Sequence, residues 1–310
     1  MSHFIAVDAG GTQLRAACYP NIGSDPLISR RIPTQSLESR PVERLLSLIK
    51  SVWPEQGDVD AIGLAVPGAV NPYEGCVYVS PNIPGWVDLP LRKIVQEEFK
   101  TPTAVGNDAN LAALGEWRFG AGQGHHNLIY FTISTGIGGG VIENDRLLLG
   151  QRGLAAEVGH IMVDPDGPIC GCGQRGHLEA IASGPAIARW VTAQIAAGTE
   201  SCLKGDPSIT AREVAEAARK GDALSCAAFE RAGFWFGRTL ADFLHLFNPS
   251  VVVLGGGVTR SGELIFKPIR ASVEKHTMSH MYYQDLVITR AQLGDDAGLV
   301  GALTLAHSLV

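Results

Sequence analysis

The sequence predicts an α/β protein built from two related domains that face a cleft. Apolar runs typical of buried strands alternate with segments whose apolar residues recur at helical spacing. The same order of elements begins again near residue 127, with a strand, a glycine-rich turn and a second strand. We therefore expect a smaller domain of residues 1–117 together with the C-terminal helix 297–310, and a larger domain of residues 118–296.

The elements of the first half follow from its apolar pattern. Residues 4–8 and 12–19 are two apolar runs on either side of a glycine turn, which predicts a hairpin. Residues 41–53 carry apolar side chains at helical spacing and predict an amphipathic helix. We then expect, in order, a strand, a helix, a strand and a helix at residues 61–68, 89–99, 103–108 and 110–120.

The second half repeats this plan. Residues 127–144 again predict strand, glycine-rich turn and strand, and "PSVVVLGGG" (249–257) resembles "DAIGLAVPG" (60–68), since each is a buried strand closed by glycine. The remaining segments are helical in pattern: 185–198, 210–221, 227–247 and 297–310. We expect the last of these to pack against the first half.

Composition excludes several classes of protein. The chain has 310 residues, 45% of them hydrophobic, and a net charge of −6. It contains no block of Lys and Arg, which argues against binding to nucleic acid. The longest apolar stretches, such as residues 250–258, are shorter than the roughly 20 residues that a membrane-spanning helix needs. With no signal peptide visible and six cysteines that form no disulfide framework, the chain is expected to be cytoplasmic.

Two glycine-rich hairpin turns suggest phosphate binding. A turn such as "DAGGT" (8–12) is by itself an ordinary hairpin signal, and "STGIGGG" (134–140) alone is weak evidence. Two such turns at corresponding places of two half-chains favour a nucleotide triphosphate held by backbone N–H groups, with the first aspartate near a metal ion. A third loop, residues 255–257, fits either the adenosine part of the nucleotide or a plain turn between strand and helix. The sequence has neither a P-loop nor a dinucleotide-binding fingerprint.

Five motifs in order resemble those of the ROK family of sugar kinases and related repressors. The motifs are "DAGGT" (8–12), "GND" (106–108), "STGIGGG" (134–140), "EVGH" (157–160) and "CGCGQRGHLE" (170–179). The resemblance implies a pair of actin-like, ribonuclease-H-like domains. It also implies transfer of the γ-phosphoryl group of ATP, with Mg²⁺, to a hexose or an N-acylhexosamine, usually at the 6-hydroxyl.

The resemblance also implies roles for individual residues. Asp108 is the expected general base, although a carboxylate before a helix also serves as an N-cap. Asp8 is expected to hold Mg²⁺ through water. The expected nucleotide-binding residues are Asp8, Gly10, Gly11, Thr12, Thr135, Gly136, Gly255, Gly256 and Gly257. The expected sugar-binding residues are Gly68, Asn82, Asn107, Asp108, Glu157, His160 and Glu179.

The resemblance includes a structural zinc site. In the family one His and three Cys bind the metal, and here His160, Cys170 and Cys172 match, whereas His177 stands where the third Cys is expected. Two thiolates and two imidazoles remain a good ligand set for zinc. The alternative is that the two cysteines are an accidental pair and that zinc was lost with the third. If His160 binds zinc through one ring nitrogen and the sugar through the other, the metal positions the sugar site.

Among sugars, glucose is the first choice, because Glu157 and Glu179 suit the hydroxyl groups of a plain hexose. N-acetylmannosamine, N-acetylglucosamine and fructose are alternatives. A sugar-responsive repressor without catalysis is a further alternative, disfavoured because the first strand begins at His3 or Phe4 with no helix-turn-helix before it. The resemblance also implies a homo-oligomer, a dimer or a tetramer.

Overall fold

A computed structural model describes residues 2–37 and 39–310. Its contacts divide the chain into two compact units, each described by itself below. The first unit contains the residues up to His125, together with Gly140–Ala156 and Gln292–Val310. The second contains His126–Gly139 and Glu157–Ala291. This division differs from the expected boundary near residue 118, and it assigns residues 140–156 to the first unit.

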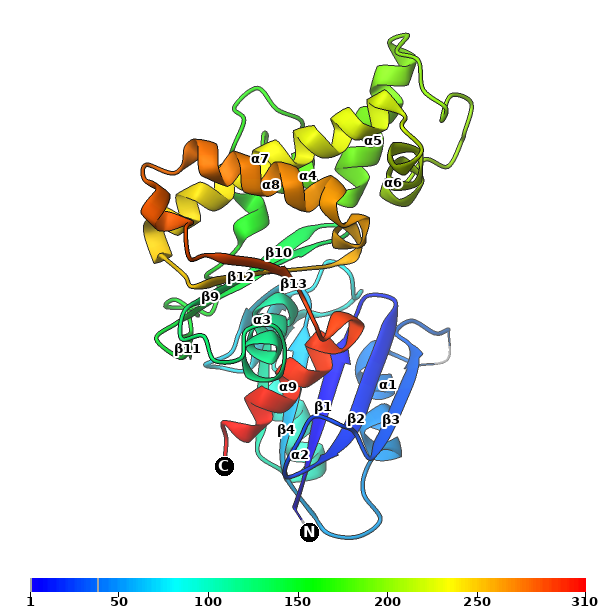
Figure 1. The fold of residues 1–310 in the computed structure, drawn as a ribbon. Helices are drawn as coiled ribbons and strands as arrows, with labels where there is room; N and C mark the ends of the chain where they lie inside the picture. The colour runs from blue at the N-terminus through cyan, green and yellow to red at the C-terminus, as the bar shows by residue number, and fades with distance from the viewer. Residues whose placement is uncertain (1, 38) are drawn as a thin grey trace. The chain divides into compact units, whose positions relative to one another are not determined.

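The first unit contains a five-stranded sheet of order β3-β2-β1-β4-β8, of which β3, β2, β1 and β4 are labelled in Figure 1. β1 (Ser2–Ala9) pairs antiparallel with β2 (Gln13–Pro20), which confirms the predicted hairpin. β3 (Ile28–Pro33), which was not predicted, extends the sheet beyond β2. β4 (Asp58–Val66) lies parallel to β1, and β8 (Thr103–Asn107) lies parallel to β4.

Four helices bury the two faces of this sheet. On one face, core side chains of β1 pack with those of α1 (Pro41–Ser51) and α2 (Leu91–Phe99). On the other face, they pack with side chains of α3 (Asp108–Phe119) and α9 (Ala297–His307). The expected packing of the last helix against the first half of the chain is therefore present. Alternating side chains of β1 separate the two cores, since Ile5 and Val7 belong to one and Phe4 and Ala6 to the other.

A small antiparallel sheet completes the first unit and was not predicted. It consists of β5 (Ala69–Asn71), β6 (Cys76–Val79) and β7 (Val87–Leu89). The loop between β6 and β7 contains Asn82, and Trp86 in the same loop is almost fully buried. The small sheet therefore anchors a loop that the sequence assigned to sugar binding.

The second sheet has the order β11-β10-β9-β12-β13. β9 (Leu128–Ile133) and β10 (Ile137–Glu143) flank the second glycine-rich turn, and β12 (Val251–Gly255) lies parallel to β9. β13 (Val287–Arg290) continues in parallel, and the short β11 (Arg146–Leu147) forms the other edge. The order matches that of the first sheet strand for strand, so the repeat inferred from the sequence is confirmed.

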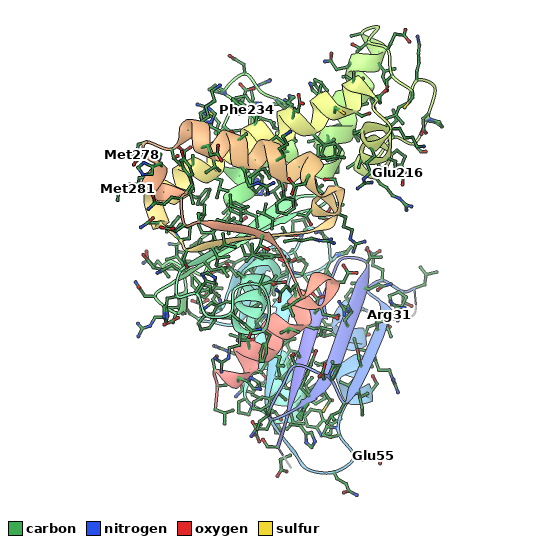
Figure 2. All side chains as sticks on the ribbon, viewed as in Figure 1. Arg31, Glu55, Glu216, Phe234, Met278 and Met281 are labelled. Atoms are coloured by element: carbon green, nitrogen blue, oxygen red, sulfur yellow. The ribbon has the colours of Figure 1, made fainter. Side chains whose placement is uncertain are left out.

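The second unit is richer in helix than the first. The predicted helices correspond to α5 (Gly184–Ala196), α6 (Ala211–Arg219) and α7 (Ala223–Phe247). Two further helices, α4 (Leu178–Ala182) and α8 (Glu263–His276), were not predicted, and both contact α7. Beyond α8, Met278 and Met281 are exposed (Figure 2), and Leu246 at the end of α7 is exposed as well. None of the helices in the described part of the chain combines the length and the apolarity that crossing a bilayer requires.

Candidate functional site

The turn after β1 is fixed by its own backbone and by the loop that contains Asn82. The Gly10 N–H donates to the Gln13 carbonyl at 2.9 Å, and the Thr34 hydroxyl donates to the Gly10 carbonyl at 2.6 Å. A Cβ atom on Gly11 would lie 2.7 Å from the Cβ of Asn82, so only glycine fits there. The turn expected to bind phosphate therefore packs against the loop expected to bind sugar.

Asp8 lies at the end of β1 in an environment rich in carboxylates. Burial raises its pKa from 3.8 to about 6, and the neighbouring Asp108 and Asp296 carboxylates act in the same direction. The Arg15 guanidinium, 3.9 Å away, lowers the pKa of Asp8, but by less than burial raises it. A Cβ on Gly298, in the first turn of α9, would lie 3.0 Å from both Asp8 carboxylate oxygens. Carboxylates gathered in this way suit a hard divalent cation such as Mg²⁺, which would relieve their repulsion.

Asp108 is the first residue of α3, and Asn107 caps this helix. The Asn107 Oδ1 accepts the Ala109 and Asn110 N–H groups at 3.0 and 3.1 Å, while its Nδ2 donates to the Gly68 carbonyl at 3.0 Å. The cap is therefore supplied by Asn107, while the half-buried Asp108 carboxylate accepts the Ala109 N–H at 2.8 Å and also interacts with the Asn107 side chain. Burial raises the pKa of Asp108, which favours its acting as a proton acceptor.

Gly68 lies at the bend between β4 and β5. Its φ is +98°, and a Cβ there would lie 2.3 Å from the Val79 carbonyl oxygen. Glycine is therefore required at this position, and the Gly68 carbonyl orients the side chain of Asn107. Of the expected sugar-binding residues, Gly68, Asn82, Asn107 and Asp108 all belong to the first unit.

The second glycine-rich turn lies between β9 and β10. The Ser134 N–H donates to the Gly136 carbonyl at 2.8 Å, and the Gly184 N–H, at the start of α5, donates to the Ser134 carbonyl at 2.9 Å. The Ile137 N–H donates to Glu179 Oε2 at 3.0 Å. A Cβ on Gly136 would lie 2.5 Å from that same oxygen. As in the first unit, the turn glycine is covered by a residue expected to bind sugar.

A cavity of about 1190 Å³ opens beside this turn within the second unit. It is lined by Ser134 and Thr135, by small and apolar residues of α5 and α6, and by the 3-10 helix η2 (Gly257–Ser261). The volume is ample for a nucleoside, because ligand pockets commonly measure about 300–1,000 Å³. Gly257 lines the cavity, whereas Gly255 and Gly256 do not. These two pack instead against the Tyr130 hydroxyl and the Ile133 backbone.

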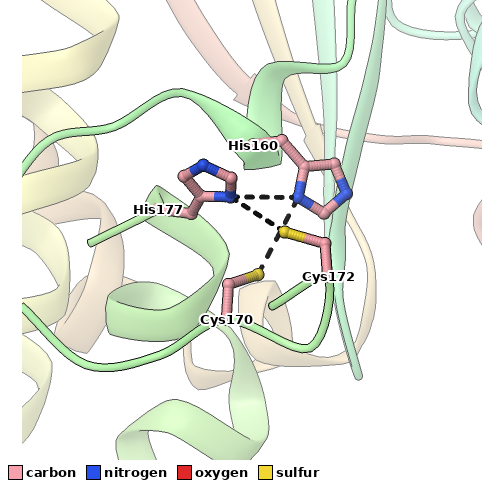
Figure 3. A group of neighbouring side chains, drawn as sticks. All are labelled: His160, Cys170, Cys172 and His177. Carbon is pink, nitrogen blue, oxygen red and sulfur yellow. Dashed lines mark hydrogen bonds between the residues drawn. The ribbon is translucent and has the colours of Figure 1, made fainter. Parts of the chain in front are cut away.

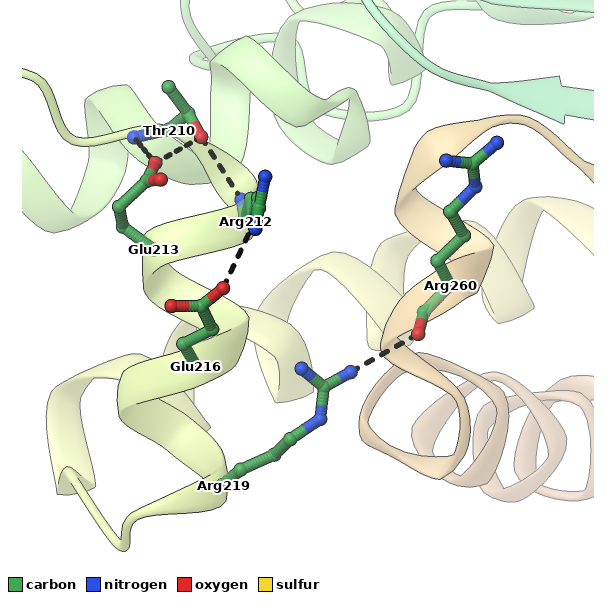
Figure 4. Close-up of polar contacts among 6 residues, drawn as sticks. All are labelled: Thr210, Arg212, Glu213, Glu216, Arg219 and Arg260. Carbon is green, nitrogen blue, oxygen red and sulfur yellow. Dashed lines mark hydrogen bonds and ion pairs between the residues drawn. The ribbon is translucent and has the colours of Figure 1, made fainter.

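The wall of the cavity carries arginines that the sequence did not single out (Figure 4). Arg212 pairs with Glu216 at 3.1 Å along α6, where both residues line the cavity. Arg219 reaches from the end of α6 to η2 and donates to the Arg260 carbonyl at 3.1 Å. The Arg219 contact joins the two walls. The lining arginines, which also include Arg189, outnumber the one lining acid, Glu216, so the rim is positive and suits an anionic ligand. No spacing motif in the sequence marks these arginines.

His160, Cys170, Cys172 and His177 come together in one cluster, as expected (Figure 3). Their ligand atoms all lie within 4.8 Å of one another. The two His Nδ1 atoms are 3.4 Å apart, and the Sγ–Nδ1 distances are 3.8 Å for Cys170 with His160 and 3.3 Å for Cys172 with His177. Tetrahedral zinc with ordinary bond lengths gives ligand–ligand distances of about 3.3–3.8 Å. The three distances above lie in this range, so the cluster is compatible with zinc, and His177 takes the place expected for cysteine.

The remaining sugar-binding candidates gather around this cluster. His160 turns Nδ1 toward the cluster, and its backbone N–H donates to the Glu157 carbonyl at 3.1 Å. Glu179 accepts the Cys170 thiol at 3.4 Å through Oε1. Glu157, His160 and Glu179 thus share one region of the second unit.

A comparison with protein-family models finds the ROK family over residues 4–309. The chain belongs to the ROK family. It is 37% identical to the glucokinase of Streptomyces coelicolor over 310 residues, which cover 98% of this chain and 97% of that protein. It is also 32% identical to the N-acetylglucosamine repressor of Shigella flexneri, over 87% of this chain and 66% of the repressor.

Among solved structures, this ROK protein resembles a ROK family glucokinase from Streptomyces griseus in complex with glucose and AMPPNP. The two chains are 39% identical, the match covers 99% of each, and the TM-score is 0.81. The α/β architecture described above is therefore that of ROK glucokinases, with the actin-like fold that the resemblance implied.

Proposed function

We propose that this ROK protein is an ATP-dependent kinase that phosphorylates the 6-hydroxyl of glucose. The observation that carries the proposal is the similarity over nearly the full length of both chains to glucokinases, one of them solved with glucose and an ATP analogue. The sequence features agree with it, since Asp108 and both glycine-rich turns are present.

In the proposed reaction, Asp108 is the general base. The oxygen of the sugar 6-hydroxyl bonds to the γ-phosphorus, the bond from that phosphorus to the bridging oxygen of ADP breaks, and the hydroxyl proton passes to the Asp108 carboxylate. Asn107 holds the start of α3 and thereby fixes where the Asp108 carboxylate lies. The raised pKa of Asp108 makes it a better proton acceptor than an exposed aspartate.

The nucleotide is assigned to residues of both turns. The backbone N–H groups of Gly11 and Thr12 and those of Thr135 and Gly136 are proposed to donate to phosphate oxygens. Gly10, whose own N–H donates to the Gln13 carbonyl, is proposed to shape the first turn around the phosphates. The cavity beside Thr135 is proposed to hold the adenosine part, with Gly257 in its wall. Mg²⁺, when bound, neutralises the phosphate charge, and Asp8 is the residue proposed to hold it through water.

Zinc is proposed at His160, Cys170, Cys172 and His177 in a structural role. A closed site of four protein ligands stabilises the loop in which it lies, because binding and folding of such a loop are coupled. His160 would then offer its Nε2 atom to the sugar, as the orientation of Nδ1 toward the cluster leaves that nitrogen pointing elsewhere.

The experiment that tests the function is an assay of ADP formation with ATP and Mg²⁺ across a panel of sugars. Glucose is expected to give the highest kcat/KM, against mannose, fructose, N-acetylglucosamine and N-acetylmannosamine. A higher kcat/KM for an acylated hexosamine would replace glucose as the substrate and keep the kinase. Activity on none of these sugars would contradict the kinase.

The second candidate is a sugar-binding regulator, favoured by the similarity to the N-acetylglucosamine repressor. The net charge of −6 disfavours contact with DNA. Sugar binding without ADP formation would support this candidate. The expected dimer or tetramer stays a prediction, which size-exclusion chromatography with light scattering measures directly.

A further inference from the structure

Glu179 links two features of the second unit that lie apart in the sequence. Its Oε2 atom accepts the Ile137 N–H of the glycine-rich turn at 3.0 Å. Its Oε1 atom accepts the Cys170 thiol of the His/Cys cluster at 3.4 Å. One carboxylate thus contacts both the turn assigned to phosphate and the cluster assigned to zinc.

The turn is shaped to receive this carboxylate. A Cβ at residue 136 would lie 2.5 Å from Glu179 Oε2, so the absence of a side chain at Gly136 makes the contact possible. The Ile137 N–H that Glu179 accepts follows directly on the residues proposed to donate to phosphate. Moving the carboxylate would therefore change the conformation of the turn or leave its amide without a partner.

The position of Glu179 depends in turn on the cluster. Glu179 is in the first turn of α4, which begins directly after His177. It therefore lies close in sequence to one cluster residue, His177, and is hydrogen-bonded to another, Cys170. The loop between His160 and His177 has little core of its own, because Ile161, Met162 and Ile169 are exposed. Among the described residues, two isolated bridges, Met162 with His177 and Ile169 with Arg175, tie the loop to itself.

We propose that Glu179 is a positioning residue through which the metal state of the His/Cys cluster controls nucleotide affinity at the glycine-rich turn. Zinc would take the Cys170 sulfur as a thiolate, which has no proton to donate, so the Cys170–Glu179 hydrogen bond belongs to the metal-free state. Zinc that fixes His177 also fixes the start of α4, and the Glu179 carboxylate, released from Cys170, then holds the Ile137 N–H and the turn in the binding conformation. This inference rests on the proposed function, and it adds an energetic coupling between two sites.

The test is a thermodynamic cycle on the full chain. The dissociation constant of the non-hydrolysable analogue AMPPNP with Mg²⁺ is measured by calorimetry, without sugar, for the zinc-loaded and the zinc-depleted protein. Depletion is expected to weaken binding about tenfold, within the roughly 5–150-fold range of coupled sites. Glu179→Ala is expected to bind as weakly as the depleted protein in both metal states. Glu179→Gln, which keeps an oxygen that can accept the Ile137 N–H, is expected to retain the metal effect.

Controls separate this coupling from loss of fold. Glu200→Ala removes an exposed carboxylate of the same unit that pairs with Lys204, and it is expected to show the same metal effect as the unmodified protein. Hydrogen exchange needs no variant: the peptide that contains the Ile137 amide is expected to exchange faster after zinc depletion.

Three outcomes would overturn the inference. They are an unchanged AMPPNP affinity on depletion, an equal metal effect in Glu179→Ala, or an unchanged exchange rate at residues 134–140. Failure of the loaded, unmodified protein to bind AMPPNP would overturn the proposed function itself, and the two failures are thereby distinguished.

Discussion

Replacing Asp8 by asparagine is expected to stabilise the ligand-free protein above pH 6. Burial and the carboxylates of Asp108 and Asp296 raise the pKa of Asp8 from 3.8 to about 6, so the charged form is disfavoured in the folded state. Because each pKa unit corresponds to about 1.4 kcal/mol, the ionised carboxylate costs about 3 kcal/mol. The side chain is 23% exposed, so solvent screening reduces this value only moderately.

Because the pKa of Asp8 is raised in the folded state, the direction of the pH dependence of stability follows. Between pH 4 and pH 6 the folded state binds a proton that the unfolded state has released, so the free energy of unfolding falls as the pH rises through this window. The Asp8→Asn variant has no such titrating group, and the stability difference between the two proteins should be absent below about pH 4 and complete above about pH 6. Urea denaturation of both proteins at pH 4, 5, 6 and 8, without metal or nucleotide, measures it. A variant that is less stable than the unmodified protein at pH 8 would refute the reasoning.

Three further predictions concern the site. Asp108→Asn should lower kcat by about 10²-fold or more while the dissociation constant for glucose, measured by calorimetry, changes little; a loss of only a few-fold would mean that Asp108 is not the base. Gly136→Ala should displace the Glu179 carboxylate from its amide partner and lower the free energy of unfolding by about 1–3 kcal/mol, and equal stability by urea denaturation would contradict the contact. Cys172→Ser should reduce bound zinc, measured by plasma emission spectrometry, far below one atom per chain, whereas Cys202→Ser, at another exposed cysteine, should retain it; equal zinc contents would argue against the cluster.

The sequence predicted the repeated core of the fold because long apolar runs closed by glycine have few alternative structures. The hairpin β1–β2 and the parallel strands β4 and β8 were found in this way, and so were their counterparts β9, β10 and β12. The small sheet β5-β6-β7 was missed because strands of three or four residues are too short to show an alternating pattern. Helix α8 contains Pro268, a residue that usually argues against a helix interior.

The site was predictable where residues form compact motifs. The His/Cys cluster assembled as the family resemblance implied, because its four members lie within 18 consecutive positions and close on one loop. By contrast, Asp296 near Asp8 and the arginines around the cavity come from distant segments. Only folding brings such residues to a site, so their spacing in the sequence carries no signal. The cap of α3 is a finer case: the sequence suggested Asp108 as a possible cap, and the structure assigns the cap to Asn107, one residue earlier.

The packing of α9 against the first strand has a consequence for how the protein folds while it is being synthesised. Leu299, Ala302 and Leu303 of this helix share one core with Phe4 and Ala6 of the first strand, although almost three hundred residues separate them. A ribosome releases the first strand long before it has synthesised its last packing partner. During translation the part of this hydrophobic face that α9 covers therefore stays exposed until α9 emerges, and we expect truncation before α9 to promote aggregation.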